Sequence, residues 1–249
     1  MRNTELEKLI NQHLNSTDFH DYVPNGLQVT GREEIKNIIT GVTACQALLD
    51  QAVAKNADAI IVHHGYFWKN ELPLIQGIKR QRLKTLLVND INLYSWHLPL
   101  DAHPQLGNNA QLAKMLDIKI QGEIVPLLCW GTFLQPLTSE SLITIITSKL
   151  GRTPLYCANK KQAPNLISSV AWCTGAGQKF ITEAANFCVD AFITGEASES
   201  TIHSARENNL HFFAAGHHAT ERGGIQALTK WLKKNYALNV NFIDIYNPV

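Results

Sequence analysis

One apolar stretch places the tightest constraint on the fold. It runs Ala57-Asp58-Ala59-Ile60-Ile61-Val62 and ends in His63, His64 and Gly65. A short, continuous apolar run predicts a strand buried on both faces, as in a sheet covered by helices. Gly65 is expected to turn the chain. The two adjacent histidines then lie at the strand end, where an open α/β sheet presents its binding crevice.

The His63-His64 pair allows two interpretations. Successive side chains of a strand point to opposite faces of the sheet. If both histidines bind metal, they therefore serve two metals, or one of them leaves the strand direction at the turn. The alternative is a structural pair whose ring nitrogens are satisfied by ordinary hydrogen bonds. The pair taken alone does not decide between them.

The segments around this strand predict an α/β unit. Residues 38–42 read as a strand and residues 45–55 as a helix, which leads into the histidine-bearing strand. Strand, helix and strand form a βαβ crossover, so these two strands are expected to be parallel. A helix over residues 78–90 and a strand over residues 91–95 follow, and Gly107-Asn108-Asn109 is expected to open another helix.

The N-terminal segment shows a capping pattern. In Thr4-Glu5-Leu6-Glu7, Thr4 is the expected N-cap and Glu7 stands three residues later. The helix that it starts is expected to run to about Leu14. Between residues 125 and 166 the patterning weakens, apart from a helix over residues 142–150 with Gly151 as its C-cap.

The second half of the chain repeats the first. A shift of about 132 positions places Val170-Ala171 on Ile38-Ile39 and Asp190-Ala191-Phe192-Ile193 on Asp58-Ala59-Ile60-Ile61. At a slightly different shift, His217-x-x-x-Glu221 after residues 211–215 corresponds to His97-x-x-x-Asp101 after residues 91–95. The sequence therefore predicts an α/β protein made of two similar units related by duplication.

The boundary between the units is expected near residues 123–126. The first unit, residues 1–125, then carries His63-His64 and His97/Asp101. The second, residues 126–249, carries His217/Glu221, and its C-terminal segment is expected to pack back on the first.

Imidazole and carboxylate groups gather at the ends of the predicted strands. Both are ligands of Zn, Mn, Fe, Co and Ni. Their number exceeds the need of one four-coordinate ion and suits two metals that share a carboxylate and a water. The alternative is a structural cluster of polar side chains. The candidates are His63, His64, His97, Asp101, His217 and Glu221.

Three further features are less specific. Glu196 takes the place of His64 in the repeat and either supports a ligand or is solvated. Thr174-Gly175-Ala176-Gly177 resembles a phosphate-cradling turn but lacks the complete G-x-G-x-x-G and the Walker lysine. Cys173 is expected to be a small buried residue and no nucleophile.

Charge and cysteine content exclude several classes. The 249 residues have a formal net charge of +1 and no run of Lys or Arg, so no dedicated nucleic-acid surface is expected. Five cysteines without a Cys-x-x-Cys pair argue against a disulfide framework. No membrane-spanning segment and no apolar signal core in residues 1–10 are recognisable. The expectation is a soluble cytoplasmic protein.

Five motifs over residues 20–225 carry a family resemblance. They are Pro24-Asn25-Gly26-Leu27-Gln28-Val29, Ile61-Val62-His63-His64, His97-x-x-x-Asp101, Asp190-Ala191-Phe192-Ile193-Thr194-Gly195-Glu196 and Gly216-His217-His218-Ala219-Thr220-Glu221. In these motifs the chain resembles the NIF-three-like family, often named GTP cyclohydrolase 1 type 2 homologs, in its short bacterial form.

The resemblance implies a fold, a site and an assembly. The fold is two interlinked α/β units with a dinuclear metal site between them, and the assembly is a homohexameric ring with sites facing an inner cavity. His97 matches a nearby site residue and is the expected catalytic group that moves protons. The implied metal ligands are His63, His64, Asp101, His217 and Glu221, with Glu221 as the bridge.

Two functions remain open at this stage. The first is a cyclohydrolase-like enzyme that uses two divalent ions (Zn, Mn, Fe, Co or Ni) and a metal-activated water to hydrolyse a nucleotide or related phosphate compound. The second is a non-catalytic metal-binding ring that acts as a metallochaperone or regulatory partner. Nearly complete ligation favours the second, because a catalytic metal keeps an open position.

Overall fold

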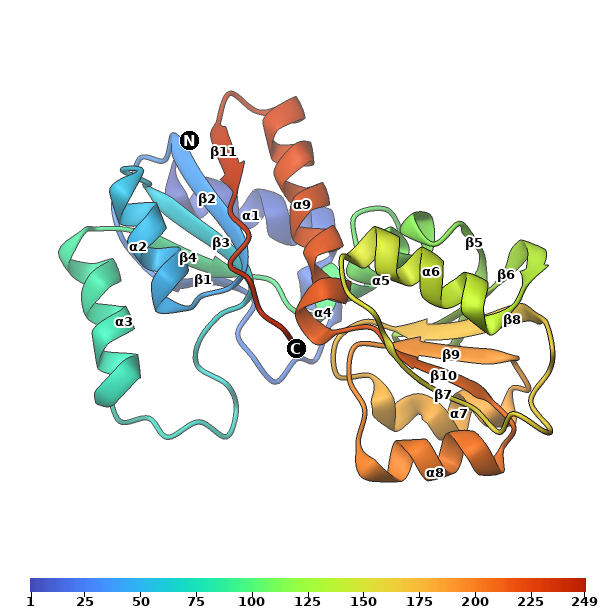
Figure 1. Cartoon of the computed structure of the whole chain (residues 1–249). Helices are drawn as coiled ribbons and strands as arrows, with labels where there is room; N and C mark the ends of the chain where they lie inside the picture. Colours follow the sequence, from blue (N-terminus) through green and yellow to red (C-terminus); the bar gives the residue numbers. More distant parts are fainter. The chain divides into compact units, whose positions relative to one another are not determined.

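The computed structural model describes every residue from Met1 to Val249 (Figure 1). The fold is a mixed α/β fold with two sheets, and the chain divides into two compact units. The first unit comprises Met1–Gly107 and Gly224–Tyr246, and the second comprises Asn108–Gly223 and Asn247–Val249. No helix is both long enough and apolar enough to span a bilayer.

The first unit is built on a five-stranded sheet with the order β1-β4-β3-β2-β11. The three central strands and β11 run parallel, and β1 pairs antiparallel with β4 at the edge. The strands are β1 Gly26–Val29, β2 Asn37–Thr43, β3 Ala59–His64, β4 Asn92–Ser95 and β11 Asn239–Phe242. The expected parallel crossover from β2 to β3 is confirmed.

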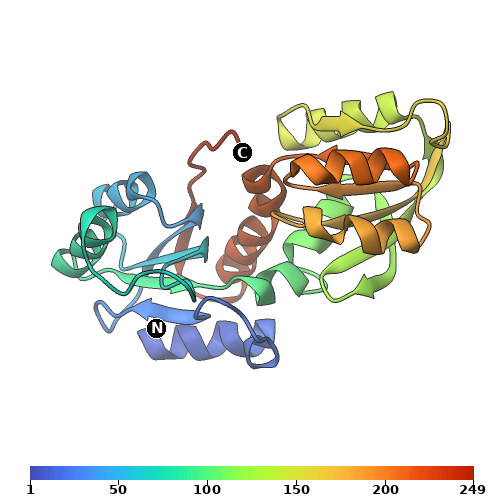
Figure 2. The ribbon, with the colours of Figure 1, turned by 90° about the horizontal axis from the view of Figure 1, so that it is seen from below.

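Helices cover both faces of this sheet. Figure 2 shows α1 on one side, and the core there also takes in residues of α9. Residues of α2 and α3 pack into the core on the opposite side. The helices of this unit are α1 Asn3–Leu14, η1 Ser16–Asp18, α2 Gln46–Ala54, α3 Gly77–Val88, α4 Leu98–Ala102 and the later part of α9 His217–Asn235.

Strand β3 is buried on both faces, as its apolar run predicts. Ala59 and Ile61 belong to the core beneath α1 and α9, whereas Ile60 and Val62 belong to the core beneath α2 and α3. All four side chains are fully buried. Burying Ile60, Ile61 and Val62 stabilises the unit by up to about 1.5–3 kcal/mol each, which fixes the strand that carries the histidines.

The second unit is built on a six-stranded sheet with the order β5-β6-β8-β9-β10-β7. Strands β8, β9 and β10 are parallel and the other pairs are antiparallel. The strands are β5 Ile118–Val125, β6 Leu128–Leu137, β7 Leu155–Cys157, β8 Ile167–Cys173, β9 Ala191–Thr194 and β10 His211–Ala214.

The helices of the second unit also lie on both faces of its sheet. One core contains α5 and α6 residues, and the other contains α7 and α8 residues (Figure 1). The helices are α5 Asn108–Met115, α6 Ser139–Leu150, η2 Gln178–Phe180, α7 Ile181–Asn186, α8 Glu199–Glu207 and the start of α9. Gly151 ends α6 in the left-handed conformation, as predicted.

The division into units differs from the one expected at residues 125 and 126. Residues 108–125 belong to the second unit, because β5 pairs along its length with β6. Residues 224–246 belong to the first unit, because β11 pairs with β2.

The predicted cap of α1 is wrong by two residues. Arg2 is the N-cap, and its backbone N–H donates to the Glu5 carboxylate at 2.9 Å. The Glu7 carboxylate instead accepts from the backbone N–H of Leu27 at 2.9 Å. Glu7, which the local pattern assigned to the capping box, therefore binds the backbone of β1 instead.

Candidate metal site

His63 lies at the end of β3 and its side chain is fully buried. Its Nδ1 lies 3.0 Å from the carbonyl oxygen of Trp96. Because a carbonyl only accepts, Nδ1 carries the proton and donates it, which leaves Nε2 for another partner. Nε2 lies 3.4 Å from Oδ1 of Asp101. An imidazole lone pair that faces a carboxylate at this distance needs a cation, either a proton or a metal, between the two groups.

His64 and His97 lie beside His63. The His63 ring centroid is 4.5 Å from that of His64 and 5.1 Å from that of His97. One ring nitrogen of each histidine lies within 4.8 Å of the others. His64 is partly exposed, and its Nδ1 is 3.3 Å from the Thr43 hydroxyl. Three imidazole nitrogens this close together can hold one divalent ion.

Helix α4 places Asp101 next to this group. It begins directly after His97, and the backbone N–H of Asp101 donates to the His97 carbonyl at 3.1 Å. Asp101 therefore lies one helical turn after His97. We name the four side chains His63, His64, His97 and Asp101 the first-unit cluster.

The second unit has its own cluster at the start of α9. His217 and Glu221 lie one turn apart, with His217 Nε2 3.0 Å from Glu221 Oε2. On the other side of the ring, Nδ1 lies 2.5 Å from Oε1 of Glu196, which follows β9. We name His217, Glu221 and Glu196 the second-unit cluster.

The second-unit cluster is electrostatically ready for a cation. Burial lowers the pKa of His217, but hydrogen bonds and charge attraction from Glu221 and Glu196 outweigh burial and raise it to about 9. Two carboxylates thus stabilise positive charge on this imidazole. Glu196, which sequence alone left open between support and solvation, is a hydrogen-bond partner of His217. A carboxylate on Nδ1 fixes the orientation of a ligating imidazole.

The glycine-bearing turn after β8 serves this cluster directly. Gly175 has φ +63°, and a Cβ at this position would collide with the Glu221 carboxylate and lie 3.1 Å from His217 Nε2. Its N–H donates to the Thr220 hydroxyl at 3.0 Å. The absence of a side chain here makes room for Glu221, so the turn has a local role that does not involve phosphate.

All six predicted site residues thus lie in the two clusters. The first unit holds His63, His64, His97 and Asp101, and the second holds His217 and Glu221. Imidazole and carboxylate are the donor set that divalent transition metals take, so these residues fit the implied ions. Sequence reasoning missed Asp21, whose carboxylate lies 3.0 Å from His97 Nδ1. Its only sequence signal is its place just before the Pro24-Asn25-Gly26 turn.

Comparisons with known proteins agree with the fold. The family described as Duf34/NIF3 (NGG1p interacting factor 3) matches residues 1–248. The chain is 64% identical over 248 residues to the GTP cyclohydrolase 1 type 2 homologs of Salmonella typhimurium and Escherichia coli K12, with 100% of both chains covered.

Solved structures give the same result. The structure titled protein ybgI, of unknown function, matches with a TM-score of 0.98 and 64% identity, covering 100% of both chains. TTHA1606 from Thermus thermophilus matches with a TM-score of 0.92 and 31% identity, again covering 100% of both chains. The chain therefore shares its fold with these two solved structures. The chain belongs to the Duf34/NIF3 family.

Proposed function

We propose that the chain is a metal-dependent hydrolase of the cyclohydrolase-like kind, with a nucleotide or related phosphate compound as substrate. The observation that carries the proposal is the 3.4 Å separation of His63 Nε2 and Asp101 Oδ1 in a buried position. Bound divalent ions would lower the pKa of a water molecule and polarise substrate oxygens. The name of the 64% identical relatives supports the substrate class.

The two clusters form one dinuclear centre in this proposal. The first-unit cluster supplies His63, His64 and Asp101, and the second-unit cluster supplies His217 and Glu221. The Glu221 carboxylate has two oxygens, so it would be able to contact both ions. Neither cluster alone supplies the ligands of two ions, which supports a centre between the units.

The residues of the two clusters have different roles in this proposal. His63 and Asp101 would hold one ion, and the hydrogen bond from His63 Nδ1 to Trp96 fixes the ring. His217 is fixed in the same way by Glu196. His97 is the group that moves protons, since its ring lies 5.1 Å from that of His63.

The test is a substrate screen on protein of known metal content. Freshly purified protein is first analysed for bound Zn, Mn, Fe, Co and Ni. Turnover is then assayed across nucleotides with each of these metals added. Hydrolysis that depends on metal and is lost in His97→Gln supports the proposal. Metal-loaded protein with no turnover of any nucleotide would contradict it.

A non-catalytic role is the second candidate. With Glu221 shared between the ions, the five ligands and His97 would nearly complete the coordination of two four-coordinate ions, whereas a catalytic ion needs an open position. The protein would then carry metal as a metallochaperone or as a regulatory partner. Transfer of bound metal to a chelating acceptor, without turnover of any nucleotide, would favour this role.

Assembly and location are part of the same proposal. A homohexameric ring is proposed from the family resemblance, and the exposed apolar side chains Leu72, Ile75 and Ile78 suit a buried contact. Light scattering that shows a monomer at micromolar concentration would exclude the ring. The five free cysteines suit a reducing cytoplasm.

A further inference from the structure

The loop before β1 reaches across to the His97 ring. Both carboxylate oxygens of Asp21 lie near His97 Nδ1, Oδ1 at 3.0 Å and Oδ2 at 3.3 Å. The Asp21 side chain is 3% exposed and that of His97 is 8% exposed. A contact between a buried carboxylate and a buried imidazole, 76 positions apart in the chain, needs support from its surroundings.

That support comes from three further hydrogen bonds. Asp21 Oδ2 accepts from the backbone N–H of Leu98 at 3.0 Å and from the amide of Asn25 at 3.0 Å. Asn25 Oδ1 in turn accepts from the backbone N–H of His97 at 2.8 Å. Asp21 and Asn25 therefore fix the ring of His97 and the backbone on both sides of it.

We propose that Asp21, supported by Asn25, is the positioning residue for His97 and holds its imidazole in the tautomer that carries the proton on Nδ1. A carboxylate offers only acceptors, so the nitrogen that faces it must be the donor. Nε2 is then left with its lone pair. This inference rests on the proposed function for the chemistry that it assigns to His97.

Asp21 remains an acceptor in this setting. Burial raises the pKa of its carboxyl group, but the hydrogen bond and the charge attraction of His97, together with the hydrogen bonds from Asn25 and Leu98, outweigh burial, so that the pKa lies below its ordinary value. An ionised carboxylate and an Nδ1 proton are therefore the compatible pair of states.

Rotation of the ring is restricted by aromatic neighbours. Tyr22 and Trp68 meet His97 edge-on, with ring centroids at 5.1 Å and 5.3 Å. With Nδ1 held by Asp21, Nε2 is the ring nitrogen that remains to exchange a proton beside His63 and His64. One nitrogen of each of the three histidines lies within 4.8 Å of the others.

The fixed tautomer gives His97 a defined step. Nε2 accepts a proton from a water molecule as the water oxygen attacks the substrate. The ring then carries protons on both nitrogens, and Asp21 stabilises this cation without taking a proton itself. The proton leaves from Nε2 to the departing group, which restores the starting tautomer.

The test is a direct measurement of the tautomer. Protein labelled with 15N-histidine is freed of metal with a chelator and studied by long-range 1H–15N correlation in mildly alkaline buffer. The His97 signals are identified by their loss in His97→Gln. The expected result for the wild type is a protonated Nδ1 and an unprotonated Nε2. A protonated Nε2 in the wild type would overturn the proposal without any variant being needed.

Asp21→Asn provides the sharp variant because it keeps the shape of the side chain. Its amide oxygen is expected to take the place of Oδ2, where Leu98 and Asn25 donate. Its NH2 group then faces His97 Nδ1 and donates to it, so the proton moves to Nε2. Asp18→Asn is the matched control, because it removes the same charge from an exposed position in the same segment. The control is expected to keep the wild-type tautomer.

Activity separates this inference from the proposed function. Where nucleotide hydrolysis is found, Asp21→Asn is expected to lower kcat by a factor on the order of 10²–10⁴, with KM and metal content near wild type. Absence of turnover in every sample contradicts the proposed function and leaves the tautomer result standing. A wild-type tautomer or a wild-type kcat in Asp21→Asn overturns the positioning role alone.

Discussion

Asp58 and Asp190, 132 positions apart, accept equivalent pairs of backbone hydrogen bonds in the two units. Asp58 Oδ2 accepts from the backbone N–H groups of Lys36 and Asn37 at 2.9 and 2.8 Å. Asp190 Oδ2 accepts from those of Ser168 and Ser169 at 2.9 and 2.8 Å. Each carboxylate ties its own strand to the start of the preceding parallel strand, so the duplication extends to single hydrogen bonds.

The register of the strands repeats as well. Ala59 pairs with Ile38 in the first unit, and Ala191 pairs with Val170 in the second. The carbonyl of Asp58 accepts from Asn92, as that of Asp190 does from His211, each at 3.0 Å. Equivalent strand ends therefore carry the first-unit and second-unit clusters, which explains why His97/Asp101 and His217/Glu221 have matching spacings.

Asp190→Ala is expected to destabilise the second unit by about 1–3 kcal/mol, because two backbone donors and the Ser169 hydroxyl lose a charged acceptor. Urea denaturation followed by circular dichroism measures the loss. Glu207→Ala removes an exposed acid from the same unit and is expected to change stability by less than about 0.5 kcal/mol. Equal effects of the two changes would show that the Asp190 bonds contribute little.

Gly175→Ala is expected to lower metal content, because its new Cβ would displace the Glu221 carboxylate. Gly151→Ala is the matched control. Gly151 has φ +74° and no atom within 4 Å of the added Cβ. The Gly151→Ala variant therefore has a similar backbone strain but no contact with a metal ligand. Elemental analysis of both purified variants decides the matter. Full metal content in Gly175→Ala would show that Glu221 is no ligand or can move without loss.

The sequence was most informative where both faces of a strand are buried. In β3, Ile60 and Val62 enter one core and Ala59 and Ile61 the other, so the apolar run was continuous and unmistakable. The first-unit and second-unit clusters could be predicted because polar residues follow such strands directly.

The missed elements have partly exposed surfaces. β5 and β6 show mixed burial, from fully buried Leu128 to Leu134 at 84% exposure, so no clear period appears between residues 118 and 137. The C-terminal segment was expected to return to the first unit, but its pairing as β11 with β2 could not be predicted, because no local pattern specifies a partner so far away in the chain. The contact between Asp21 and His97 could not be predicted from the sequence either, because the two residues are 76 positions apart.

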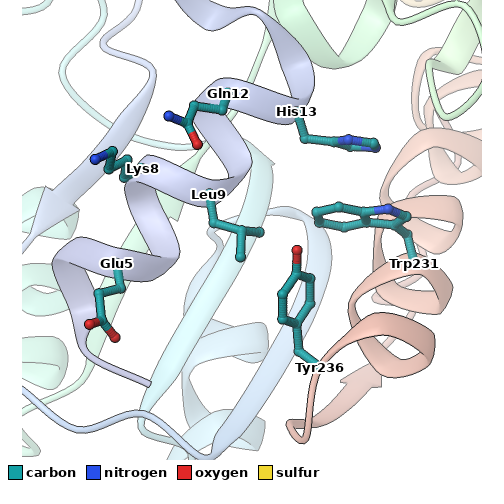
Figure 3. Close-up of a pocket in the computed structure, with 7 residues that line it drawn as sticks. All are labelled: Glu5, Lys8, Leu9, Gln12, His13, Trp231 and Tyr236. Carbon is teal, nitrogen blue, oxygen red and sulfur yellow. The ribbon is translucent and has the colours of Figure 1, made fainter.

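Acid is expected to weaken the contact between α1 and α9. In Figure 3 the His13 ring faces Trp231 at the edge of a hollow of about 480 Å³, and the two rings stack with centroids 3.9 Å apart. Burial lowers the pKa of His13 below its ordinary 6.5. Burial, together with repulsion from His13, lowers that of His103.

The sign follows from proton linkage. Between the folded and unfolded pKa values, the unfolded chain binds more protons than the folded one. The stabilisation from neutral His13 is therefore complete above about pH 6.5. It is lost as the pH falls through the lower pKa of the folded state. Urea midpoints measured from neutral to acidic pH should fall less steeply in His13→Gln than in the wild type. If the urea midpoint falls equally steeply with pH in both proteins, His13 does not cause the loss of stability in acid.

Metal removal tests whether the two clusters form one centre. Ligand at a hundred times its Kd stabilises a protein by about 2.7 kcal/mol, which for a chain of this size is a shift in Tm of roughly 5–10 °C. Chelation is expected to lower the wild-type Tm by that order. His64→Ala in the first unit and Glu221→Ala in the second are each expected to remove most bound metal and most of this shift. The fold is expected to stay intact, because His64 ends β3 and Glu221 lies only one turn into α9.

The double variant makes the test quantitative. In a shared centre each single change already abolishes most binding, so His64→Ala combined with Glu221→Ala adds little further loss of metal or of metal-dependent Tm. In two independent sites each single change would remove only its own ion, and the losses would add. His203→Ala, an exposed histidine paired with Glu199 on α8, is the control and is expected to keep the full metal content. Additive losses would separate the clusters and end the proposal of one dinuclear centre.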